Sequence, residues 1–145
     1  MAVDSHGNLY VPDFFNNRVL RYNAPVTTGE PAVAVWGQPS FSMGSCNQGG
    51  GPTASSLCLN SGNGENSGAG VAVDAQGNLL VADPGNHRLL RFPFNAVTGL
   101  PDNTADMVLG QPDFNTSQAA SSGTDMNHLR FPDSVRVDAS GKVYA

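Results

Sequence analysis

The chain has 145 residues, the length of about one domain, and a formal net charge of −5 at pH 7. Charged residues make up only 13% of it, and it contains 17 Gly and 10 Pro, which favours many short strands and turns over helices. Its seven Lys and Arg residues are scattered, which argues against a nucleic-acid partner because phosphate contacts need clustered basic side chains. No run of about 18 apolar residues is present, so the sequence predicts no membrane span.

The beginning of the chain is repeated at a fixed interval. Residues 2–21 return as residues 72–91, at a constant offset of 70 positions. A third copy opens at Val135 and continues to the end of the sequence. Self-similarity at a fixed period indicates a repeat architecture, in which each unit buries its apolar face against a neighbour.

Each unit is predicted to form four short antiparallel strands. An opening strand ends at Val3 or Val73, and an Asp-x-x-Gly turn follows, in which Asp accepts hydrogen bonds from the next amides and Gly takes a positive φ. The second strand has consecutive apolar positions, as in a sheet buried on both faces. We expect the later strands at residues 9–11, 18–22 and 32–36, and at residues 79–81, 88–92 and 106–109.

Two kinds of turn recur inside the units. The turns at residues 13–16 and 83–86 are each flanked by an Asp and an Arg, which we expect to pair across the turn in a structural role. These pairs are Asp13 with Arg18 and Asp83 with Arg88. A further turn is predicted at residues 28–31 and 98–101.

Four short antiparallel strands per unit are typical of a propeller blade. The sequence therefore predicts an all-β fold, a β-propeller segment of about two and a half four-stranded antiparallel blades. The predicted divisions are a first blade at 1–41, an inter-blade loop at 42–69, a second blade at 70–114, a connection at 115–132 and the start of a third blade at 133–145.

The predicted number of blades is smaller than a closed propeller contains. Closed propellers contain about four to eight blades, so we expect either further blades of the same protein or homo-oligomeric neighbours. Met1 aligns with Val71 and Val135, the apolar residues that open the same strand in the other copies. This alignment favours an interior segment of a longer protein over a true start codon.

The loop at 42–69 is rich in Gly, Ser and Asn and is expected to lie on the surface rather than in the core. It contains both cysteines, Cys46 and Cys58, with eleven residues between them. A disulfide there would stabilise the fold by roughly 3 kcal/mol and would indicate an oxidising compartment; two free thiols are the alternative. The spacing does not suit zinc, and no His lies nearby in sequence.

No residue pattern predicts a catalytic, cofactor-binding or metal site. His6 and His87 lie at turn positions, and His128 precedes the third copy. The repeated Asp residues also sit at turns, where Asp is expected without any metal.

The motif Val-Ala-Val-Asp-x-x-Gly-Asn-Leu-x-Val-x-Asp-x-x-Asn-x-Arg-Leu-Leu-Arg is complete at 71–91 and nearly so at 1–21. It resembles the NHL repeat of β-propeller proteins. The Gly-Gln-Pro-x-Phe that follows at 37–41 and 110–114 resembles the long-period NHL-like repeats of bacterial extracellular proteins. The resemblance implies a propeller that binds, although some similar proteins are metal-dependent lyases and others bind RNA through a basic face.

We therefore expect a non-enzymatic binding or structural scaffold, secreted or at the cell surface, without a cofactor. The loops at 42–69 and 115–130 would contribute recognition of a protein or glycan ligand, or packing between molecules. The alternative is a metal-dependent lyase or hydrolase on an NHL-type propeller, with its site mainly in blades beyond this sequence. A metal held by His and carboxylate side chains in the central channel would distinguish the enzyme from the scaffold.

Overall fold

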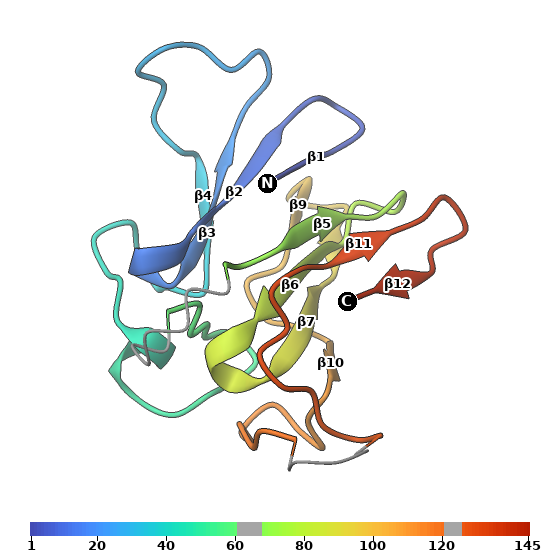
Figure 1. The fold of residues 1–145 in the computed structure, drawn as a ribbon. Coiled ribbons are helices and arrows are strands. Elements are labelled where there is room, and N and C mark those ends of the chain that lie inside the picture. The colour runs from blue at the N-terminus through green and yellow to red at the C-terminus, as the bar shows by residue number, and fades with distance from the viewer. Residues whose placement is uncertain (61–67, 121–125) are drawn as a thin grey trace.

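The computed structural model describes residues 1–60, 68–120 and 126–145, and within these ranges the chain is all-β (Figure 1). It forms two four-stranded antiparallel sheets and a two-stranded start of a third. The helical segments within the described ranges are short: single 3-10 turns at η1 (Phe14–Asn16) and η3 (Pro84–Asn86), and the bent segment η2 (Cys46–Gly49), in which Asn47 and Gln48 have positive φ. The predicted fold class is confirmed, and the sheets are consistent with propeller blades.

The two complete sheets repeat the same strand order. The first contains β1 (Ala2–Val3), β2 (Leu9–Asp13), β3 (Arg18–Tyr22) and β4 (Ala34–Trp36), and the second contains β5 (Val71–Val73), β6 (Leu79–Asp83), β7 (Arg88–Phe92) and β10 (Met107–Leu109). The third unit contains β11 (Arg136–Val137) and β12 (Val143–Tyr144). The opening strand β5 contacts both β1 and β11, so successive units pack through their first strands (Figure 1).

The core lies on both faces of the second sheet. In β6, Leu79 and Val81 face the first unit, whereas Leu80 and Ala82 face the third. All five residues of β6 are buried, as predicted for a sheet covered on both sides. In β2 only Tyr10 is buried, because the described chain supplies that sheet with a neighbour on one face alone. The prediction of two-sided burial is therefore confirmed for the second unit and wrong for the first.

The element boundaries differ from the predicted ones at several places. The second strands, β2 and β6, extend past their predicted ends to Asp13 and Asp83. The fourth strands begin later than expected, at Ala34 and Met107. The predicted turn at 98–101 contains strand β9 (Leu100–Pro101), which pairs with β8 (Phe94–Asn95) in an additional hairpin. The turns at 13–16 and 83–86 close as 3-10 turns followed by a left-handed residue, Asn17 at φ 50° and His87 at φ 54°.

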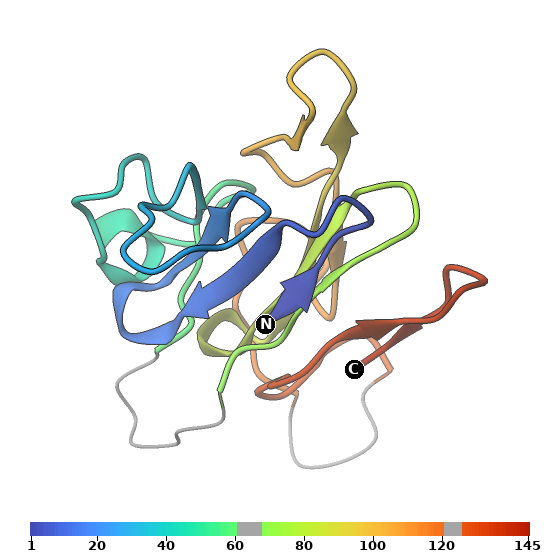
Figure 2. The same ribbon diagram turned by 90° about the horizontal axis from the view of Figure 1, so that it is seen from above.

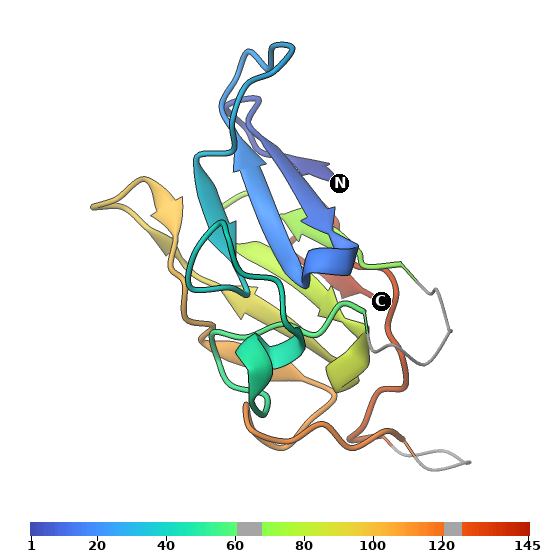
Figure 3. The same cartoon turned by 90° about the vertical axis from the view of Figure 1, so that its left-hand side faces the viewer.

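The expectation that the loop at 42–69 stays out of the core is wrong. Leu57 and Leu59 are fully buried and belong to the core between the first two units. The loop can enter because Gly37 leaves room for Leu57: a Cβ on Gly37 would come within 2.5 Å of Leu57 Cδ1. Figure 3 shows this connection, in teal and green, passing from the first sheet to the second. Residues 61–67 of the loop, and 121–125 of the second connection, lie outside the described residues.

Candidate functional site

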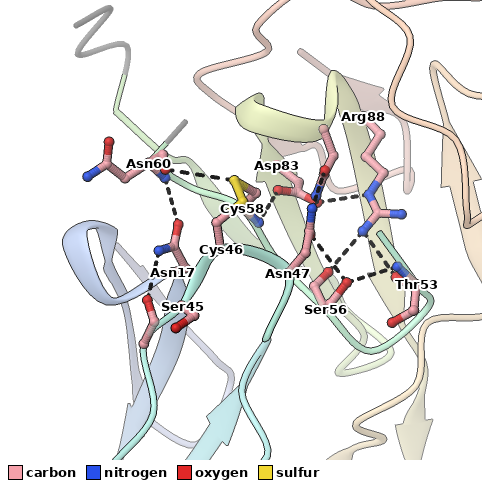
Figure 4. Close-up of a disulfide and its surroundings, with 12 residues drawn as sticks. Asn17, Ser45, Cys46, Asn47, Thr53, Ser56, Cys58, Asn60, Asp83 and Arg88 are labelled. Carbon is pink, nitrogen blue, oxygen red and sulfur yellow. Dashed lines mark hydrogen bonds and ion pairs between the residues drawn. A yellow bond between two sulfur atoms is a disulfide. The ribbon is translucent and has the colours of Figure 1, made fainter. Parts of the chain in front are cut away.

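The inter-unit connection is tied together by a disulfide, which confirms that prediction (Figure 4). Cys46 and Cys58 are bonded, with their Cα atoms 4.4 Å apart. The backbone N–H of Cys58 donates to Asp83 Oδ1 at 2.8 Å. The disulfide closes the connection on itself, and the backbone of Cys58 binds it to the turn of the second sheet, where the Gly85 N–H also donates to Cys58 O at 2.9 Å.

At that turn lies a fully buried ion pair (Figure 4). Arg88 Nε donates to Asp83 Oδ2 at 2.8 Å, and both side chains are 0% exposed. The remaining Arg88 nitrogens donate to backbone carbonyls on both connections, those of Thr53, Ser56 and Phe114. A buried charge is tolerated only when it is paired and hydrogen-bonded in this way. Asp83 and Arg88 therefore act as a structural lock between units.

The equivalent pair of the first unit is open to solvent. Arg18 Nε lies 2.7 Å from Asp13 Oδ2, with the two side chains 15% and 25% exposed. Arg18 also donates to the carbonyl of Phe41, the counterpart of the bond from Arg88 to Phe114. No connection like that of residues 53–58 covers this pair among the described residues.

The Gly-Gln-Pro motif ties each unit to the connection that follows it. Gln38 Nε2 donates to the carbonyls of Asn17 (3.0 Å) and Ser45 (2.8 Å). Gln111 Nε2 repeats this arrangement with the carbonyls of His87 (3.1 Å) and Gln118 (2.7 Å). Sequence analysis missed this role, although the motif's place after each fourth strand was visible.

His87 is also part of this packing. Its ring is buried, lies edge-on to Phe131 with the ring centroids 4.4 Å apart, and accepts the Phe131 N–H at Nδ1 (3.2 Å). Burial lowers the pKa of His87 and the charge of Arg130 lowers it further, against the opposing influence of Asp83. The imidazole is therefore held neutral as a hydrogen-bond acceptor.

A cleft opens at the other ends of β2 and β6, between the Asp-x-x-Gly turns of the first two units. Figure 2, seen from above, shows the dark-blue turn after β1 beside the green turn after β5. The cleft has a volume of about 440 Å³. Its lining comes from both units: Asp4, Ser5, His6, Asn8, Tyr10 and Arg21 from the first, and Asp74, Ala75, Gln76, Gly77, Phe94 and Gly99 from the second.

The turn carboxylates in this cleft are already hydrogen-bonded. Asp4 Oδ1 accepts the N–H groups of His6 and Asn8, each at 2.9 Å, and Asp74 accepts those of Gln76 and Asn78 in the same way. Burial alone would raise the pKa of Asp4, but these bonds, the Asn8 side chain and the charge of Arg21 hold that pKa below its usual value. Both turns match the predicted Asp-x-x-Gly geometry, with Gly7 and Gly77 at positive φ.

Among the described residues, no group of three or more His, Cys, Asp or Glu side chains is placed to hold a metal ion. Within the same residues, the structure has no helix that is both long and apolar enough to cross a membrane. The six residues predicted for structural roles form three separate pairs: the disulfide and the two Asp–Arg pairs.

Comparison with known proteins identifies the second unit. No curated protein shows a significant match to the chain. The family model of the NHL repeat matches residues 69–92, which run from just before β5 to the end of β7. The chain therefore contains an NHL repeat at residues 69–92.

Proposed function

We propose that the protein is a non-enzymatic binding or structural scaffold, part of an extracytoplasmic NHL-type propeller of the bacterial extracellular kind. The observation that carries the proposal is that the polar side chains that recur in the repeat form hydrogen bonds within the framework. Asp83 accepts the backbone N–H of Cys58 and pairs with Arg88. Backbone carbonyls accept hydrogen bonds from Gln38 and Gln111. These side chains therefore tie the units to the connections between them. Side chains used in this way position a rigid framework rather than a reacting group.

The disulfide supports a secreted or cell-surface location. Disulfides persist in oxidising compartments and are rare where thiols are kept reduced. The bond between Cys46 and Cys58 joins two parts of one connection that is packed into the core. A protein that depends on such a bond is suited to an extracytoplasmic setting.

The partly exposed ion pair of the first unit, Asp13 with Arg18, supports the presence of a further neighbour beside that unit. Asp83 and Arg88 are covered by residues 53–58, whereas Asp13 and Arg18 remain partly exposed. We propose that a further blade, or a homo-oligomeric neighbour, covers this face of the first sheet in the working protein. Ligand recognition then belongs to surfaces that are not used in packing, and the cleft between the first two units is such a surface.

The proposal is tested by binding and by the chemical fate of the ligand. The protein is applied to an array of glycans and peptides, and each retained ligand is analysed by mass spectrometry after long incubation, with and without EDTA. We expect retention of a ligand whose mass is unchanged and whose binding does not depend on EDTA. Conversion of the ligand, especially conversion that EDTA abolishes, would refute the scaffold and favour the metal-dependent lyase or hydrolase.

A further inference from the structure

The two complete units differ at one arginine that occupies the same place in both. In the second unit, Arg91 Nε and Nη2 hold the Asp106 carboxylate in a two-pronged ion pair, at 2.9 and 2.8 Å. The equivalent residue of the first unit is Arg21, which lies in the cleft. The pair in the second unit shows how a carboxylate sits on this arginine.

Among the described residues, no carboxylate of the first unit forms an ion pair with Arg21, although the charge of Arg21 acts on Asp4. Val33 occupies the position of Asp106, because the Val33 N–H donates to Arg21 O (2.8 Å) just as the Asp106 N–H donates to Arg91 O (3.0 Å). Arg21 Nη1 donates to Asn23 Oδ1, whereas its Nε is buried and has no hydrogen-bond partner. The buried Nε cannot be reached from solvent, so a carboxylate that enters the cleft would bind the end of the guanidinium that lines it.

The rest of the cleft suits a hydroxylated ring. Phe94 is 41% exposed and its ring offers an apolar surface to the cleft. Ser5, His6 and Gln76 supply exposed groups that can hydrogen-bond to hydroxyls. Asp4 Oδ2 accepts a single bond, from Asn8 Nδ2, and so keeps capacity for a hydroxyl donor.

The charges in the cleft limit the ligand further. Two carboxylates lie in the cleft: Asp4, on which the charge of Arg21 acts, and Asp74, which interacts with the charge of Arg91 outside the cleft. A ligand with several negative charges would be repelled, whereas one carboxylate on an otherwise neutral sugar meets one arginine. Most of the residues that line the cleft have polar side chains, and several belong to the Asp-x-x-Gly turns, so directional hydrogen bonds can give specificity.

We propose that the cleft between the first two units binds an acidic saccharide, with the uronate carboxylate on Arg21 and the sugar ring beside Phe94. The inference rests on the proposed binding function and names the ligand class for it. The carboxylate binds the end of the Arg21 guanidinium that lines the cleft rather than the buried Nε. Tyr10, which also lines the cleft, lies against that side chain, with its ring centroid 5.9 Å from the Arg21 guanidinium carbon.

The test uses NMR titration of the whole chain with cellobiouronic acid and digalacturonic acid as probes. Cellobiose and succinate serve as the neutral sugar and the ringless acid. We expect at least one of the two acids to bind, at least about tenfold more tightly than cellobiose and succinate, because only the acidic sugar satisfies both parts of the cleft. Failure of both acids, or equal binding of cellobiose or succinate, would overturn the inference.

Variants locate the binding. Arg21→Gln is expected to weaken binding of the acidic sugar about tenfold or more, and Val33→Asp is expected to do the same by supplying an internal carboxylate to Arg21. Val33 is exposed, so the second variant tests the site without emptying the core. Arg91→Gln, the matched control outside the cleft, should leave binding unchanged. Unchanged binding in Arg21→Gln or in Val33→Asp would overturn the inference.

The two proposals fail in different ways. If neither acid binds but a ligand from the array is retained unchanged, the acidic-saccharide inference is refuted and the scaffold stands. If an acid binds through Arg21 and is chemically converted, the site stands and the non-enzymatic function is refuted.

Discussion

The buried ion pair gives the sharpest test of how the units hold together. Replacing Asp83 by asparagine removes the negative charge while keeping the size of the side chain. Arg88 would then remain charged at 0% exposure without its counter-ion. The amide oxygen of the introduced side chain could still accept the N–H of Cys58, but the amide nitrogen would replace Oδ2, which accepts from Arg88 Nε and Asn86 Nδ2. The change therefore removes the charge and the Oδ2 acceptor while keeping the bond to Cys58.

The expected loss is large because the charge is fully desolvated. Removing one partner of a buried ion pair costs about 3–5 kcal/mol, since the other charge is left uncompensated. We expect Asp83→Asn to lower the free energy of unfolding by about that amount, measured by urea denaturation followed by tryptophan fluorescence. Trp36 is a suitable probe because it lies in the core between the two units and its Nε1 is bonded to the carbonyls of Pro101 and Asp102.

The repeat supplies the matched control. Asp13→Asn makes the same change in a pair whose side chains are 25% and 15% exposed, where the expected loss is about 1 kcal/mol or less. Equal losses at the two positions would refute the reasoning, because the difference is attributed to burial alone. If Asp83→Asn is too unstable to fold in water, its unfolding can be measured in added sucrose, which favours the compact state, with both variants treated alike.

Three further changes probe the packing around this lock. Replacing Cys46 and Cys58 by Ser should lower the free energy of unfolding by about 3 kcal/mol in urea titrations, and reductant should then have no further effect, unlike in the parent protein. Gly70→Ala should cost about 1–3 kcal/mol, because its Cβ would lie 2.5 Å from the backbone of the third unit, whereas Gly51→Ala, with nothing within 4 Å, should change stability by less than about 0.5 kcal/mol. Because the pKa of His87 is lowered from 6.5 in the folded state, the unfolded chain binds the proton more readily; its contribution to stability is present above pH 6.5 and is lost as the pH falls below it. His87→Asn should therefore reduce the fall in thermal midpoint between pH 7 and pH 5, and an unchanged slope would contradict the assignment.

At acidic pH, the pH dependence of stability reports carboxylates rather than His87. Hydrogen bonds from Ser140 and from the Lys142 N–H lower the pKa of the exposed Asp138 to about 2. The pKa of Asp106 is lowered by its bond with Arg91. Carboxylates with lowered pKa values stabilise the fold above their ordinary range and lose that contribution as the pH falls below about 4. The effect of His87 is thus separable, because it appears at higher pH.

Much of the fold could be predicted because local chemistry and repetition agree. The Asp-x-x-Gly turns follow from hydrogen bonds within five residues, and the structure forms them at Asp4, Asp74 and Asp138 alike. The third strands, β3 and β7, have the predicted bounds, since the turns before them fix the register of Asp13 with Arg18 and of Asp83 with Arg88. Short-range rules sufficed wherever both partners lay in one hairpin.

The loop at 42–69, which was predicted to lie on the surface, shows where short-range rules fail. The composition of residues 42–69 indicates a surface segment, yet Leu57 is buried because it meets Gly37, twenty positions earlier in the chain. The second connection repeats the contact with Leu129 against Gly110. Average composition does not reveal a few apolar residues among many polar ones. The space left by Gly37 for Leu57, and by Gly110 for Leu129, matters only when the chain returns to the glycine.

The cleft could not be predicted for a related reason. A consensus repeat directs attention to what its copies share, and the shared Asp and Arg residues hold turns and connections. Arg21 differs from Arg91 in its surroundings, because Val33 stands where Asp106 stands in the second unit, just before the fourth strand. In a repeat protein, the framework is therefore found where the copies agree, and a binding site is sought where one copy keeps a charged residue but lacks the partner that neutralises it in the other.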